Sequence, residues 1–207
     1  MTKSILNFKF LLLITTLIFS IFFQINIYAE NTSKDEEMIT VGRNDSPVKI
    51  KVFSSHTCPH CANFHVNVFS KIEEKYIESG KVQVIFIDFP LDQAAFNSSK
   101  LLHCLDEKKQ IAFLDEIYEK QNEWTKGPDI EKINDNLKKI VKNLGISEIQ
   151  FNKCLNNENI SDKILNDRIE GQKKYSIDST PTIIINEKKL EGITDFKNIS
   201  KKIEKII

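Results

Sequence analysis

The strongest constraint on the fold is the sequence Cys-Pro-His-Cys at residues 58–61, because it stands between a strand pattern and a helix pattern. In residues 48–54 (VKIKVFS), Ile50 and Val52 alternate with lysines, and this period of two is typical of a β-strand. After the motif, apolar residues recur every three or four positions and predict an amphipathic helix: Phe64, Val68 and Ile72. The first cysteine therefore lies at a strand-to-helix turn.

This position favours thiol chemistry at Cys58. Unpaired backbone N–H groups and the positive end of the helix dipole stabilise a thiolate there, and such cysteines have a pKa of about 3.5–7.5 instead of about 8.5. We predict that Cys58 is the nucleophile and that Cys61, nearly one turn further and more buried, is the resolving thiol. Pro59 suits the first helical turn because it lacks an N–H group, and His60 supports the thiolate by charge or hydrogen bonding.

Other uses of the cysteine pair fit the sequence less well. A zinc or copper site at Cys58, Cys61 and His65 would lack a second ligand pair and would crowd one helical turn. A c-type haem is excluded because Ala62 follows the motif, and a purely structural disulfide of this spacing would be strained and reducible. We expect no metal and no cofactor, and we expect His56 to contact the substrate.

The N-terminus has the pattern of a secretory signal peptide. Lys3 and Lys9 form a positively charged region before an apolar stretch at residues 10–23, and Ala29 offers a small residue at the −1 cleavage position. A signal peptide at residues 1–29 would direct the chain to the periplasm and be cleaved after Ala29. The alternative is that the segment is not cleaved and anchors the chain in the membrane. The polar residues 30–38 are predicted to form a flexible leader.

Export and charge narrow the function classes. Four cysteines lie beyond the predicted signal peptide, and because disulfides persist in an oxidising compartment, three pairings are open. The chain has 29 acidic and 29 basic residues, and this balance argues against a nucleic-acid partner. Its 207 residues suit one domain, or one domain with an inserted subdomain.

The remaining sequence places strands on both sides of a helical block. Residues 39–41 predict a short strand, and residues 81–89 (KVQVIFIDF) predict a buried parallel strand. Residues 93–175 have helical periods and no strand pattern, and Ser147 forms a capping box with Gln150. The elements expected after the block are a strand at 182–185, a turn at Asn186-Glu187, a return strand at 188–191, and a final helix that begins at Thr194.

Two sequence segments before this helical block and one after it form a recognisable pattern: FSSHTCPHC (53–61), GKVQVIFIDFPL (80–91) and TPTIIINEKKLEG (180–192). A Cys-x-x-Cys pair alone is a weak signal, but Cys-Pro-His-Cys with the Asp-Phe-Pro-Leu strand end and the Thr-Pro strand start is specific. Over residues 39–207 the chain resembles the DsbA family of thioredoxin-fold disulfide oxidoreductases.

The resemblance implies an α/β fold with two domains and an enzymatic activity. A thioredoxin-like domain at 39–92 and 176–207 would be interrupted by an all-helical insertion domain at 93–175. The implied activity is oxidation of exported proteins: the Cys58–Cys61 disulfide passes to reduced polypeptides, and a quinone-linked membrane thiol oxidase reoxidises the pair.

The resemblance also assigns roles outside the motif. Only about 5–6% of X–Pro bonds are cis, so the residues alone predict a trans bond at Pro181. The resemblance instead implies a cis Thr180-Pro181 loop against Cys58 that binds an extended substrate peptide. The chain departs from the family at Val52, where many members carry an acid. Threonine before the proline also occurs in related isomerases and reductases.

Cys104 and Cys154 lie on separate predicted helices of the block, each beside apolar residues. From the residues alone, two buried free thiols remain open. Because some relatives carry a second disulfide in this subdomain, the resemblance favours a structural Cys104–Cys154 bond. Two alternative functions also stay open: a periplasmic isomerase or reductase, and a non-enzymatic copper or zinc metallochaperone using Cys58, Cys61 and His65.

Overall fold

The structure, a computed structural model, describes residues 38–207. The predicted signal peptide at 1–29 and all but the last residue of the predicted leader lie outside this range. Within it, none of the helices is both long enough and apolar enough to cross a membrane.

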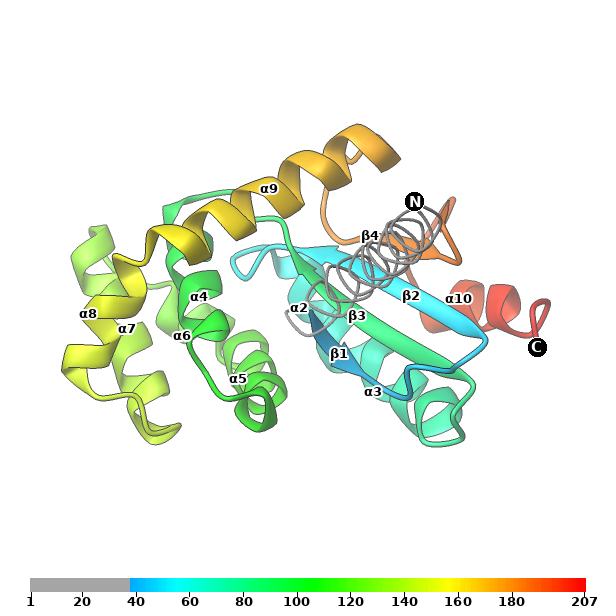
Figure 1. The fold of residues 1–207 in the computed structure, drawn as a ribbon, viewed down its shortest axis with the longest axis horizontal. Helices are drawn as coiled ribbons and strands as arrows, with labels where there is room; N and C mark the ends of the chain where they lie inside the picture. Colours follow the sequence, from blue (N-terminus) through cyan, green and yellow to red (C-terminus); the bar gives the residue numbers. More distant parts are fainter. Residues whose placement is uncertain (1–37) are drawn as a thin grey trace, which may run out of the picture. The chain divides into compact units, whose positions relative to one another are not determined.

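A mixed five-stranded sheet lies at the centre of residues 39–207 (Figure 1). Its spatial order is β1-β3-β2-β4-β5, and the parallel pair β2 and β3 is flanked by antiparallel neighbours. The strands are β1 (Ile39–Val41), β2 (Val48–Ser54), β3 (Val82–Asp88), β4 (Thr182–Ile185) and β5 (Lys188–Lys189). β1, β2 and β4 have the predicted bounds, whereas the return strand β5 is shorter than the expected 188–191.

The helix after the motif covers one face of the sheet with its apolar side. It alternates between α-helical and π-helical turns: α2 (Pro59–Phe64), η1 (His65–Phe69), α3 (Ser70–Ile72) and η2 (Glu73–Ile77). The three residues that predicted the helix, Phe64, Val68 and Ile72, are all buried. The segment ends before Gly80, whose φ of 72° is in the left-handed region that favours glycine.

Alternate residues of the strands face opposite sides, as the period of a strand requires. Ile50 and Val52 join the large core under the 59–77 helix, whereas Phe53 and Ile184 form a second cluster on the other face. There α9 (Glu158–Tyr175) approaches the sheet closely, because Gly171 has no side chain to meet the Phe53 ring.

Between β3 and β4 the chain is helical, and no strand occurs there within the described residues. The helices before α9 are α4 (Gln93–His103), α5 (Glu107–Glu119), α6 (Gln121–Trp124), α7 (Ile130–Asn143) and α8 (Glu148–Leu155). Ser147 and Gln150 form the predicted capping box. A disulfide joins Cys104, directly after α4, to Cys154 on α8. The division into two domains at residues 93 and 175 stays a prediction.

The last helix, α10 (Phe196–Ile203), has its N-cap at Asp195, one residue after the expected Thr194. The carboxylate of Asp195 accepts a hydrogen bond from the backbone N–H of Asn198 at 2.7 Å, so Asp195 caps the helix and the prediction of Thr194 was wrong. Both residue types can cap, but only the side chain of Asp195 makes the bond in this structure.

Candidate active site

Cys58 lies at the N-cap of α2, directly after the β2-to-α2 turn, and Pro59 is the first helical residue, as the sequence predicted. Cys58 and Cys61 are both free thiols in this structure. Cys58 keeps 8% of its surface exposed, whereas Cys61 keeps 1%. A reactant from solvent can therefore reach Cys58 more readily than Cys61.

The thiol of Cys58 donates a hydrogen bond to the carbonyl oxygen of Thr180 at 3.3 Å. The sheet explains this proximity: β4 runs antiparallel to β2 with Thr182 opposite Phe53, so the residues before β4 lie beside those after β2. The Thr180–Pro181 peptide bond is cis, as the resemblance implied. Pro181 directly precedes β4.

The surroundings of Cys58 favour its thiolate. A hydrogen bond from the Cys61 thiol is the largest influence, and it lowers the pKa of Cys58 to about 5 although burial opposes the shift. The hydroxyl of Thr180 and the backbone N–H groups of Cys61 and His60 lower the pKa further. The Thr180 hydroxyl is buried and makes no hydrogen bond to any described residue, so it is free to donate to a thiolate at Cys58.

Cys61 has the opposite character. Burial raises the pKa of its thiol, and the adjacent Cys58 sulfur raises it further. At neutral pH the pair therefore consists of an anionic Cys58 and a protonated Cys61 that donates to it. Such an asymmetric pair suits thiol-disulfide exchange, because the Cys58 sulfur is ionised and accessible, whereas the buried Cys61 thiol stays protonated until it resolves a mixed disulfide.

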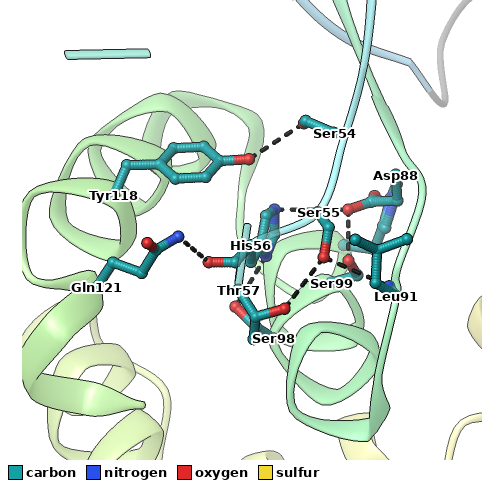
Figure 2. Close-up of polar contacts among 11 residues, drawn as sticks. Ser54, Ser55, His56, Thr57, Asp88, Leu91, Ser98, Ser99, Tyr118 and Gln121 are labelled. Atoms are coloured by element: carbon teal, nitrogen blue, oxygen red, sulfur yellow. Dashed lines mark hydrogen bonds and ion pairs between the residues drawn. The ribbon is translucent and has the colours of Figure 1, made fainter. Parts of the chain in front are cut away.

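The segment that leads to Cys58 is held by side chains from the helical block (Figure 2). Tyr118 Oη donates to Ser54 Oγ at 3.1 Å, and Gln121 Nε2 donates to the His56 carbonyl at 2.8 Å. A third hydrogen bond, from the Thr57 hydroxyl to the carboxylate of Asp92 at 2.7 Å, ties the segment to the N-cap of α4. The same Gln121 amide donates to the carbonyl of Cys58 at 3.0 Å. Sequence reasoning missed Gln121 and Tyr118, since neither stands in a motif.

The position of the His56 side chain gives no support to the expectation that it contacts the substrate, and that contact stays a prediction. Its side chain is 1% exposed, and its ring nitrogens face the interior, where Nδ1 shares a hydrogen bond with Ser98 Oγ at 2.8 Å. His60, by contrast, is exposed beside Cys58, and its supporting role stays a prediction. His65 is buried and directs Nε2 to Asp115 at 2.7 Å.

Comparison with known proteins decides the family. The sequence model described as Thioredoxin matches residues 34–205. A probable disulfide bond formation protein D of Bacillus anthracis is 30% identical over 94% of this chain and 90% of that protein. The crystal structure of alpha-DsbA1 from Wolbachia pipientis, also 30% identical, covers 82% of this chain and 90% of that one with a TM-score of 0.74. The chain belongs to the DsbA family.

Membership of the DsbA family makes this chain a thioredoxin-fold thiol-disulfide oxidoreductase. Oxidised BdbD from Bacillus subtilis, at 24% identity, shares the fold with a TM-score of 0.72 over 82% of this chain and 92% of that one. The geometry of Cys58, Cys61 and the cis Thr180–Pro181 bond agrees with this chemistry.

Proposed function

We propose that this chain is an oxidase that donates the Cys58–Cys61 disulfide to reduced, exported polypeptides in the periplasm. The observation that carries the proposal is the contrast between the two thiols: the pKa of Cys58 is lowered to about 5, and that of Cys61 is raised. A strongly stabilised Cys58 thiolate favours the reduced protein, and a protein whose reduced form is stabilised is an oxidant.

In the proposed reaction, a substrate thiolate attacks the Sγ atom of Cys58. The Cys58–Cys61 bond breaks, and Cys61 leaves with the electron pair and takes up a proton. A second substrate thiolate then attacks the substrate sulfur of the mixed disulfide, and Cys58 leaves as a thiolate. The substrate loses two electrons and the chain gains them. The low pKa of Cys58 makes it a good leaving group in the second step.

Thr180 and Pro181 are proposed to bind the substrate next to the reacting sulfur. Proline has no N–H group, so Pro181, directly before β4, cannot donate a backbone hydrogen bond to a neighbouring strand. An extended peptide can pair with the backbone of Thr180 there, as in other cases of strand addition. The contact between Cys58 and the Thr180 carbonyl supports this arrangement, because it places the edge beside the sulfur.

The proposal includes the cellular setting. A signal peptide cleaved after Ala29 would deliver the chain to the periplasm, and a quinone-linked membrane thiol oxidase would accept the two electrons from the reduced pair. Residues 39–92 and 176–207 would form the thioredoxin-like domain that carries both cysteines, and residues 93–175 the helical insertion domain that supports the segment before Cys58.

The reduction potential of the Cys58–Cys61 pair tests the direction. Equilibration with glutathione should give a reduction potential above about −180 mV, the isomerase-like value. A value near about −270 mV, that of thioredoxin, would reassign the chain as a reductase. In Cys61→Ala, the Cys58 thiolate should attack a disulfide-bonded peptide, release one peptide thiolate and accumulate as a mixed disulfide, because the resolving thiol is gone. The matched Cys58→Ala variant should form none.

A further inference from the structure

A buried polar cluster lies behind the segment that leads to Cys58, and thiol exchange as described does not use it. Asp88, the last residue of β3, stands opposite Ser54 in the parallel register. Its carboxylate accepts hydrogen bonds from the Ser99 hydroxyl and from His103 Nε2, the latter at 2.8 Å. The same carboxylate lies 3.5 Å from Nε2 of His56 (Figure 2).

The cluster is almost completely removed from solvent. Asp88 is 7% exposed, His56 1% and Ser98 0%. Burial alone raises the pKa of Asp88, but the hydrogen bond and charge of His103, with contributions from His56 and Ser99, outweigh it and hold the pKa at about 2. A buried carboxylate that stays ionised carries a large desolvation penalty, so packing alone does not explain its presence.

His56 connects this cluster to the reactive cysteine. Its ring lies between Ser98 Oγ and the carboxylate of Asp88, and its carbonyl accepts the Gln121 amide that also donates to the carbonyl of Cys58. Residue 56 is thus held through both its side chain and its backbone. A displacement of the ring would shift the backbone two residues before Cys58.

We propose that Asp88 is a positioning residue of the thiol exchange, which acts through His56 to place the Cys58 sulfur against Cys61 and Thr180. The proposal rests on the function proposed above for Cys58. Asp88 does not touch the reacting sulfurs. It orients His56, and His103 and Ser99 on α4 hold Asp88 in place.

The direction in which Asp88→Asn shifts the pKa of Cys58 distinguishes a positioning role of Asp88 from a direct effect of its charge. Replacing a buried anion with a neutral group of the same shape, as in Asp88→Asn, favours a thiolate nearby and would lower the pKa of Cys58 if charge alone mattered. If Asp88 positions the sulfur, the same variant loosens the hydrogen bonds that stabilise the thiolate and raises the pKa of Cys58.

The test is a pH titration of the reduced full chain, followed by thiolate absorbance in the ultraviolet. Asp88→Asn should raise the midpoint of Cys58 by about one pKa unit, a tenfold loss of thiolate below the midpoint. Ser98→Ala, which removes only the partner of His56 Nδ1, should shift it in the same direction by less. The control is Asp115→Asn, because Asp115 belongs to a second histidine–aspartate pair that does not hold the segment before Cys58.

The outcomes distinguish this proposal from the proposed function. A wild-type midpoint near 5 with an unchanged or lower midpoint in Asp88→Asn would overturn the positioning role alone. A wild-type midpoint in the ordinary thiol range would overturn both. If Asp88→Asn does not fold, Ser98→Ala decides: an unchanged midpoint in that variant contradicts the proposal, as does an equal shift in Asp115→Asn.

Discussion

The Cys58 thiol and the Thr180 carbonyl oxygen lie 3.3 Å apart although 122 positions separate them in the chain. The contact joins the β2-to-α2 turn to the cis-proline loop before β4, and it places a backbone acceptor beside the more exposed sulfur. Among the groups that lower the pKa of Cys58, Cys61 has the largest effect and Thr180 the next largest. Variants that remove one of these contacts at a time can therefore test how each contributes to the reactivity of Cys58.

The first prediction concerns the hydrogen bond from Cys61. In Cys61→Ala the pKa of Cys58 should rise from about 5 towards its ordinary value, because the largest stabilising contact is lost. Cys61→Ser keeps a hydrogen-bond donor and should keep the pKa low. The pH dependence of Cys58 alkylation, mapped by mass spectrometry, measures both. An equally low pKa in the alanine variant would show that Cys61 is not the main influence.

The second prediction is a pH-dependent gap in stability between the reduced and the oxidised protein. The folded pKa of Cys58, about 5, is below that of an unfolded cysteine, about 8.5. The thiolate therefore stabilises the reduced form fully above about pH 8.5, and this stabilisation is lost as the pH falls through about 5. At pH 7, which lies about two pH units above the folded pKa of Cys58, this stabilisation is at most about 3 kcal/mol, and solvent screening reduces it.

Thermal melts across this pH range provide the measurement. The reduced protein should melt several degrees above the oxidised protein near neutral pH, and the gap should narrow in acid. The reductant must leave the Cys104–Cys154 bond intact in both samples. A double variant with serine at positions 58 and 61 should show no gap, and a gap that widens in acid would contradict the sign.

The third prediction concerns the second disulfide. A bond between residues 50 positions apart should stabilise the chain by about 4 kcal/mol through the entropy of the unfolded state. Replacing Cys104 and Cys154 with alanine should therefore lower the midpoint of urea unfolding markedly. Peptide mapping under non-reducing conditions provides the direct check, and two free thiols after oxidative folding would refute the bond.

The fourth prediction concerns the close approach of α9 to the sheet. Alanine normally stabilises a helix interior relative to glycine, by up to about 1 kcal/mol. At Gly171, however, a Cβ atom would lie 2.4 Å from a ring atom of the buried Phe53, so Gly171→Ala should destabilise the protein by about 1–3 kcal/mol. Urea unfolding measures the change.

Gly127→Ala is the matched control for this variant. Its Cβ would meet Lys132 Cγ at 2.9 Å and Lys132 Cβ at 3.0 Å, and these atoms belong to an exposed residue beside a loop, where the chain can shift. This variant should cost less stability than Gly171→Ala. Equal effects of the two substitutions would show that Phe53 yields more readily than its burial indicates.

Sequence patterns predicted those helices, strands and caps that are determined by residues only a few positions apart in the chain. The alternation in β2, the β-branched run of β4 and the capping box at Ser147 each lie within a few positions, and each was confirmed. The π-helical turns at His65–Phe69 and Glu73–Ile77 were not predicted, because over so few residues their period is hard to distinguish from that of an α-helix.

By itself, the sequence determined that this chain carries a reactive thiol pair at a strand-to-helix turn, because both cysteines and their helix stand within one short segment. Only the tertiary structure decided what surrounds that pair. The partner of His56 Nδ1 is 42 positions away on α4, and that of the Cys58 thiol is 122 positions away. Sheet pairing and helix packing bring these groups together, and no local pattern of polar residues encodes which of them will meet.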